Sequence, residues 1–188
     1  MKNYLLVLFI IWSSCLNSFG QTLRISTSAN NLNIKHSGDI TCNVNLKEGK
    51  IISSGTIILG GSTQVFEDMH IECKKLEINS ATSFSFKNTT IKCDELILNS
   101  STLNLEGLNA KCEQGLKINS SVTTIFVTDK STINASSVFL TGGNLTIKKN
   151  IDTLQEAILL IKYNIGLTNG RTIVVDTYDN YLTFKLEK

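Results

Sequence analysis

Hydrophobic and polar residues alternate in short runs that recur along the chain about every twenty residues. The run IECKKLEINS at 71–80 is followed by IKCDELILNS at 91–100, and AKCEQGLKINS at 110–120 repeats the pattern with one extra residue. In the first two runs, apolar residues occupy the first, third, sixth and eighth positions. Alternation with a period of two predicts very short strands that bury one side.

The fixed spacing of like residues indicates that these runs are copies of one repeat. Three cysteines lie 20 and 19 residues apart, and three asparagines lie 20 and 20 residues apart. Weaker copies at 51–61 and 133–143 extend the repeat in both directions. The recurring positions are Cys73, Cys93, Cys112, Asn79, Asn99 and Asn119.

The repeat predicts a coil rather than a set of hairpins. Its turns contain no Asn-Gly or Asp-Gly pair, which tight hairpins favour. We therefore expect each strand to pair in parallel with its copy one repeat later. The predicted fold is all-β: a single-stranded parallel β-helix with three short strands per coil of about 20 residues, covering residues 21–150.

The repeat and its recurring asparagines resemble the right-handed parallel β-helix (β-solenoid) family of exported proteins. In that family stacked asparagines form a ladder at one corner of the coil, and the resemblance implies such a ladder at Asn79, Asn99 and Asn119. Because asparagine tolerates a left-handed backbone, we expect that conformation at these positions. Folds of this kind carry many functions, so the resemblance indicates architecture and no particular activity.

Charged residues on the outward side predict contacts between coils. Lys74 would lie over Asp94, and Lys75 over Glu95, if the coils stack in register. Opposite charges on neighbouring strands are mildly stabilising and oppose a slip of one residue.

Residues 1–20 predict a secretory signal peptide. A lysine at position 2 precedes an apolar run at 5–12, and small residues lead to Gly20, after which we expect cleavage. A second interpretation is a lipoprotein signal that leaves Cys15 acylated, although Trp12 stands where such a signal favours an aliphatic residue. Both interpretations predict an exported chain: secreted, periplasmic or on the cell surface.

Residues 151–188 depart from the repeat and predict a cap. Apolar residues spaced three and four apart within 152–165 predict a helix that Gly166 ends, and 172–186 predicts two strands around TYDN. A cap would cover the open end of the solenoid, where self-association is otherwise possible. The helix also has a weak, partial resemblance to a dockerin helix, but the glycine of a calcium loop is missing.

Composition narrows the class of partner. The 188 residues contain no proline, which fits a fold made of continuous ladders. The net charge of +2 falls to +1 without the leader, so nucleic acid is not an expected partner. No transmembrane segment is expected in the mature chain, because the apolar run of the leader is too short to span a bilayer.

The cysteines are expected to fill the core rather than to bind a metal or take part in a reaction. Four cysteines remain after the leader, and an even number in an oxidising compartment suggests disulfides. However, stacked strands hold their Cβ atoms farther apart than a disulfide prefers, so we favour free thiols in the column. Three sulfur atoms in one line cannot surround a zinc ion, and Cys42 falls outside the register of the column.

No set of residues predicts catalysis, a cofactor site or a metal site. His36 near Asp39, and His70 after Glu67 and Asp68, resemble acid–base pairs but are typical of exposed turns. The repeat would place three carboxylates in a column on one outer sheet, with lysines nearby that would neutralise their charge. The carboxylates are Asp94, Glu95 and Glu113, and the lysines are Lys74, Lys75 and Lys92.

The expected function is that of an exported, non-catalytic scaffold, structural or adhesive, with polysaccharides or cell-surface glycans as partners. The alternative is a small enzyme related to polysaccharide lyases or hydrolases. The enzyme would need a groove with two carboxylates and a basic residue around one substrate position. A third interpretation, a fragment of a longer adhesin, would leave the C-terminal coil uncapped.

Overall fold

The structure, a computed structural model, describes residues 21–119, 121–128, 131–135, 138–140, 144–149, 165–167, 172–178 and 181–187. All regular structure within these ranges is β-strand. The strands are β1 (Leu23–Ile25), β2 (Ala29–His36), β3 (Ile40–Cys42), β4 (Leu46–Ser53), β5 (Thr56–Lys87), β6 (Thr90–Leu98), β7 (Thr102–Glu106), β8 (Asn109–Ile118), β9 (Thr124–Thr128), β10 (Thr132–Ala135), β11 (Val138–Leu140), β12 (Asn144–Lys149), β13 (Ile165–Leu167), β14 (Thr172–Tyr178) and β15 (Tyr181–Glu187).

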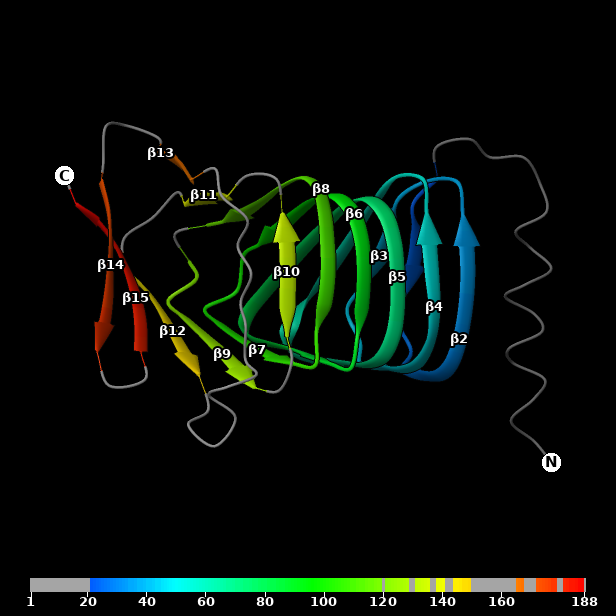
Figure 1. Cartoon of the computed structure of the whole chain (residues 1–188). Helices are drawn as coiled ribbons and strands as arrows, with labels where there is room; N and C mark the ends of the chain where they lie inside the picture. Colours follow the sequence, from blue (N-terminus) through cyan, green and yellow to red (C-terminus); the bar gives the residue numbers. More distant parts are fainter. Residues whose placement is uncertain are drawn as a thin grey trace, which may run out of the picture.

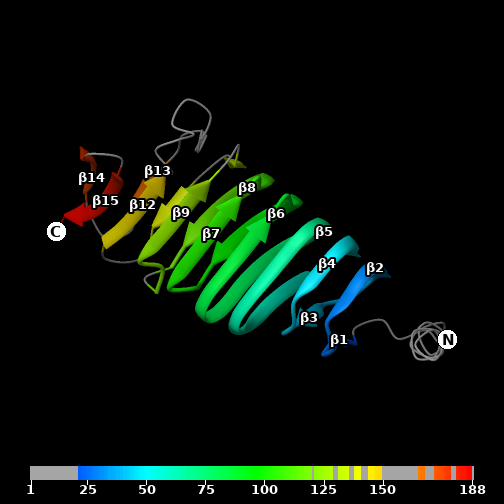
Figure 2. The same ribbon diagram turned by 90° about the horizontal axis from the view of Figure 1, so that it is seen from below.

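The strands wind into a parallel solenoid of about 5 turns, so the predicted all-β parallel solenoid is confirmed. Figure 1 shows the coils side by side, with β2 near one end and β14 at the other. The view from below shows β4, β5, β7, β9 and β12 as successive bands along the axis (Figure 2). The strands therefore pair with the next coil rather than within one coil.

The register places like residues over one another, as the repeat predicts. Ile71 pairs with Ile91, and Leu76 pairs with Leu96. Leu96 pairs in turn with Leu116 on β8. Parallel pairing at about 4.8 Å per coil lets each inward side chain pack on its copy. The predicted inward stacking of these residues is confirmed.

Alternation along the strands separates a continuous core from a polar surface. In β5, the residues at 84 and 86 are buried, and those at 83, 85 and 87 are half-buried and point outward. Phe66, Phe84 and Phe86 form an aromatic cluster, with the rings of Phe66 and Phe84 stacked at a centroid distance of 5.3 Å. Aromatic contacts of this kind add to the burial of apolar area that stabilises the core.

The left-handed corner of the coil lies elsewhere than predicted. Asn79, Asn99 and Asn119 were expected to have positive φ angles, and they do not. The backbone turns instead through one left-handed residue in each of five successive coils. These residues are Asn31 (φ 57°), Glu48 (φ 55°), Asp68 (φ 52°), Asn88 (φ 44°) and Gly107 (φ 63°). In the three coils with the cysteine column, the left-handed residue lies five positions before the cysteine.

The extra residue of the third run is absorbed at another corner. β6 pairs with β8 in register through Cys93 and Cys112, and then Glu95 pairs with Gly115. A bulge thus accommodates the insertion between the two strands. The register recovers at once, because Leu98 still pairs with Ile118.

The C-terminal region is described only in part. β12 pairs in parallel with β9 and antiparallel with β15, which pairs with β14 as an antiparallel strand pair. The predicted helix, at 152–165, lies almost wholly outside the described residues, as does the leader at 1–20. The role of this region as a cap stays a prediction.

Candidate functional site

One outer sheet of the solenoid, formed by β5, β7 and β9, carries polar side chains in straight columns. Phe84, Leu103 and Ile125 point inward from these strands and are buried, so the residues between them point outward. We call this surface the polar face. Its residues are Ser83, Ser85, Lys87, Thr102, Asn104, Glu106, Thr124 and Phe126.

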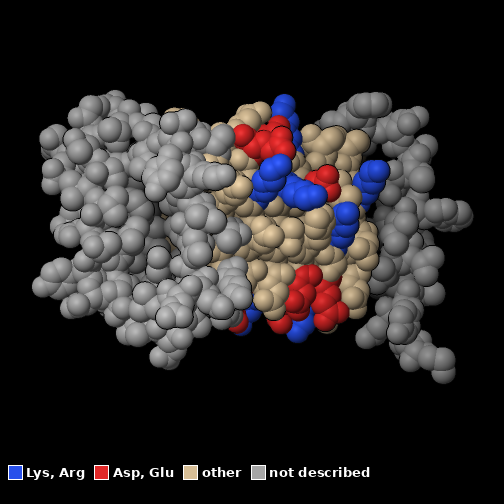
Figure 3. All heavy atoms as spheres, viewed as in Figure 1, with Lys and Arg blue, Asp and Glu red and all other residues tan. Residues whose placement is uncertain are grey.

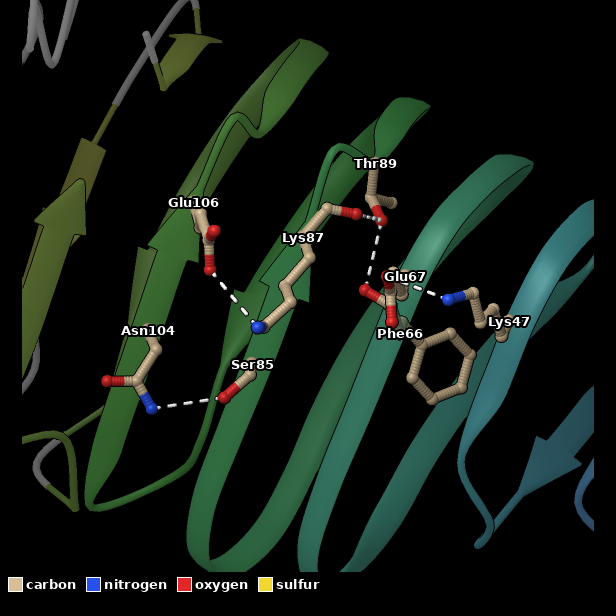
Figure 4. A network of polar contacts seen from close by, with 8 residues as sticks. All are labelled: Lys47, Phe66, Glu67, Ser85, Lys87, Thr89, Asn104 and Glu106. Carbon is tan, nitrogen blue, oxygen red and sulfur yellow. Dashed lines mark hydrogen bonds and ion pairs between the residues drawn. The ribbon is translucent and has the colours of Figure 1, made fainter. Parts of the chain in front are cut away.

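Side chains of the polar face contact their neighbours in the next coil. Asn104 Nδ2 donates a hydrogen bond to Ser85 Oγ at 3.1 Å. Lys87 Nζ lies 3.4 Å from Glu106 Oε2, and both side chains are more than 40% exposed. Figure 4 shows both contacts running across the strands, parallel to the solenoid axis. The face therefore holds ordered polar groups at the spacing of the coils.

A column of alternating charge runs along one edge of this face and continues onto the preceding coils. Lys47 Nζ lies 3.1 Å from Glu67 Oε1, and Lys87 pairs with Glu106 in the following coils. The hydrogen bond to Glu67, aided by the carboxylate charge, raises the pKa of Lys47 above its ordinary value. Sequence reasoning missed this column, although its signal was present: the four residues keep the spacing of the repeat while their charge alternates.

The polar face also carries an aromatic ring. Phe126 is 36% exposed and pairs in register with Asn104, while Thr124 pairs with Thr102. An aromatic face next to hydroxyl and amide groups offers apolar packing and hydrogen bonds together. Such a surface is chemically suited to a ligand with C–H faces and many hydroxyl groups.

The three predicted asparagines do share a corner. Asn99 Nδ2 donates to Asn79 Oδ1 at 3.2 Å, and Ser121 Oγ donates to Asn99 Oδ1 at 2.6 Å. The main-chain N–H groups of Asn99 and Asn119 donate to carbonyls of the preceding coil, at 2.8 and 3.0 Å. The corner therefore links coils through side chains and backbone, and none of the three asparagines has a positive φ angle.

The cysteines lie where the repeat puts them. Cys73 pairs in register with Cys93, and Cys93 pairs in register with Cys112. The Sγ atoms of Cys93 and Cys112 are 3.9 Å apart. All three are buried and free. Burial raises the pKa of Cys73 to about 12, and a hydrogen bond to Cys112 together with burial raises that of Cys93. The thiols of Cys73 and Cys93 therefore stay protonated, and the column acts as packing.

Cys42 belongs to a different sheet. It lies on β3 between Ile25 and Leu59, is fully buried, and its Sγ donates to the carbonyl of Val44 at 3.6 Å. Burial raises the pKa of its thiol as well. Its separation from the cysteine column agrees with the register expected from the sequence.

Lys75 lies over Glu95 in the next coil, as the sequence predicts, because the two residues pair in register. The ion pairs form differently: Lys75 Nζ lies 3.6 Å from Glu77 Oε2 on its own strand, and the described residues contain no ion pair between Lys74 and Asp94. Glu113 contacts Lys111 at 3.3 Å. Long side chains on a strand can reach the residue two positions away, which competes with the contact between coils. Figure 3 shows acidic and basic groups intermixed at the upper edge of the face that it views.

The two histidines form neither of the pairs considered from the sequence. His36 Nε2 lies 2.8 Å from the carbonyl oxygen of Gln21, whereas Asp39 Oδ1 accepts a hydrogen bond from the main chain of Thr56. His70 Nε2 lies 3.6 Å from Glu72 Oε2. These contacts hold turns and strands in place.

The described residues contain neither a candidate metal site nor a candidate membrane span. No group of three or more histidine, cysteine or carboxylate side chains is arranged to hold a metal ion within the part of the chain that the structure describes. The same ranges contain no helix long and apolar enough to cross a membrane.

Comparisons with known proteins add no relative. No protein-family model matches the chain, and neither the curated proteins nor the solved structures contain a match to it.

Proposed function

We propose that the chain is an exported, non-catalytic β-helix scaffold, structural or adhesive, that binds surface glycans through its polar face. The right-handed coil of the family it resembles belongs to this proposal. One observation carries it: on the polar face and along its border, the charged groups pair with opposite charges in neighbouring coils. What remains for a ligand is neutral and polar, next to one aromatic ring.

The chemistry of this face favours neutral sugars over acidic ones. Lys87 and Glu106 neutralise each other, as do Lys47 and Glu67, so the face has no excess of either charge. Sugars carry hydroxyl groups that can hydrogen-bond to Asn104, Thr102 and Thr124. Their C–H faces can pack on the ring of Phe126. An anionic polysaccharide would meet no unpaired lysine among these groups.

Binding can be tested with residues 21–188 on a glycan array, with and without divalent cation. We expect retention of neutral glycans that does not depend on the cation. Phe126→Ala should weaken binding about tenfold or more, since a buried aromatic contact contributes on the order of 1.4 kcal/mol. The matched control is Phe139→Ala, because Phe139 is 41% exposed on β11, in another sheet.

The outcomes separate the candidate functions. Equal losses in the two variants would show that the polar face is not the site. Absence of binding to every glycan would contradict the glycan part of the proposal and leave a structural role. If the chain shortens a bound glycan, measured as an increase in reducing ends, the lyase or hydrolase alternative would be supported instead.

A further inference from the structure

Gln21, the first residue that the structure describes, is attached to the first coil through its main chain. Its carbonyl oxygen lies 2.8 Å from His36 Nε2, whose N–H donates the hydrogen bond. Two residues later the N–H of Leu23 donates to the carbonyl of Asp39 at 2.9 Å, where β1 begins. Within the described part of the chain, the contacts of the solenoid thus begin at Gln21.

The contact to Gln21 depends on a close approach at Gly38. A Cβ atom on Gly38 would lie 3.0 Å from the carbonyl oxygen of Gln21 and 3.2 Å from His36 Nε2. These distances are shorter than ordinary van der Waals contact, so a larger residue would push one of the two groups away. The carbonyl of Gln21 therefore has a site shaped for it, whereas the residue as a whole is exposed.

Cleavage of the leader after Gly20 would give Gln21 a free α-amino group. The same residue then holds a nucleophilic amine and an exposed side-chain amide that can close a five-membered ring. We propose that Gln21 is cyclised to pyroglutamate in the exported chain. This inference rests on the export in the proposed function, and on nothing else in it.

The reaction needs no oxidant or co-reactant. The α-amino nitrogen attacks the side-chain carbon Cδ, and a C–N bond forms. The bond from Cδ to the side-chain nitrogen breaks, and that nitrogen leaves as ammonia with a proton from the attacking amine. The product is a lactam that keeps the carbonyl oxygen of Gln21, so the hydrogen bond from His36 is retained.

Cyclisation changes the surface of the first coil. It removes the positive charge of the α-ammonium group. It also removes the free amine that aminopeptidases require. A chain end held by its carbonyl and closed at its amine is then protected from trimming toward β1.

The test is intact-mass spectrometry of the chain secreted with its own leader, combined with sequencing of its N-terminal peptide. We expect a mass lower than that of residues 21–188 by one ammonia, and a peptide that yields to Edman degradation only after treatment with pyroglutamyl aminopeptidase. The matched control is Gln21→Asn, whose side chain is one methylene shorter and would need a strained four-membered ring. This variant should keep its ammonia and a free amine.

Each result decides the inference separately from export. A secreted chain that begins at unmodified Gln21 overturns it, and so does one that begins at another residue or at acylated Cys15; all of these leave export intact. A blocked α-amine in the Gln21→Asn variant would show that the block does not depend on the glutamine side chain and would also overturn it. A chain that keeps residues 1–20 and stays inside the cell contradicts the export itself.

Discussion

At the scale of single residues, Gln64 is the polar side chain with the least support. It occupies an inward position of β5, twenty residues before Phe84, and is 2% exposed. Neither Oε1 nor Nε2 has a hydrogen-bond partner among the described residues. A buried amide without partners costs about 1–3 kcal/mol, because it gives up its hydrogen bonds to water.

Replacing Gln64 with an apolar residue of similar size should therefore stabilise the fold. We expect Gln64→Met to raise the free energy of unfolding by about 1–2 kcal/mol, measured by urea denaturation. Thr63→Met, at an exposed position next to Gln64 on β5, serves as the control and should change the value by less than about 0.5 kcal/mol. A loss of stability in Gln64→Met would show that the amide has a partner of its own.

The buried thiols make stability depend on pH at the alkaline end. The pKa of Cys73 is raised from 9.0 to about 12, so the unfolded chain loses this proton first as pH rises. Its contribution to stability is complete below pH 9 and is lost as pH rises toward 12, by at most about 4 kcal/mol.

This dependence can be measured by denaturant unfolding at pH 8 and at pH 10.5. The wild type should lose more stability between these values than Cys73→Ala, which lacks the titrating thiol. Lysines and tyrosines titrate equally in both chains and cancel in the comparison. An identical loss in both chains would contradict the burial of this thiol.

At the scale of elements, the left-handed corner predicts which substitutions the turn accepts. Asn88 has a φ angle of 44°, a conformation that asparagine and glycine tolerate and β-branched residues do not. We expect Asn88→Val to lower the free energy of unfolding by about 1–3 kcal/mol and Asn88→Gly to change it by less than about 1 kcal/mol. Thermal unfolding of the two variants is the measurement, and equal effects would argue against a left-handed residue here.

The column of alternating charge predicts sensitivity to charge reversal. Lys87→Glu would place three carboxylates in successive coils, since Glu67 and Glu106 flank this position. We expect a loss of about 0.5–1 kcal/mol, which 0.5 M salt should reduce by screening. Lys35→Glu, an exposed change on β2, is the control. A loss of stability that does not change with salt concentration would indicate a packing defect rather than charge repulsion.

The sequence predicts the stacking far better than it predicts the corners. Spacing alone identifies Cys73 and Cys93 as neighbours, because a fixed period has only one register in which apolar residues all face inward. The left-handed residues differ in type from coil to coil, so no recurring residue type in the sequence identifies their positions. Recurring Asn99 marks a side-chain ladder instead. The partner of Lys75 depends on its rotamer, which spacing does not determine.

At the scale of the whole molecule, stability should differ between the first coil and the middle of the solenoid. β1 and β2 each pair along only one edge within the described chain, and their inward residues Leu23, Ile25, Leu32 and Ile34 are only partly buried. β6 pairs along both edges with β5 and β8. Repeats that contact only their neighbours lose part of their stabilisation at the ends of the array.

Hydrogen exchange followed by mass spectrometry can test this gradient. Amides of β6 should exchange at least about tenfold more slowly than amides of β2, because an end coil can open locally at a lower free-energy cost. Equal protection in β2 and β6 would show that the solenoid opens as one unit.

The alternating charges also bear on how such a chain can lengthen. Lys47, Glu67, Lys87 and Glu106 change sign at each coil, so the electrostatic pattern has a period of two coils while the backbone has a period of one. Duplicating one coil would bring two like charges together, whereas duplicating a pair would preserve the alternation. Growth of this solenoid by gene duplication is therefore easiest in even increments.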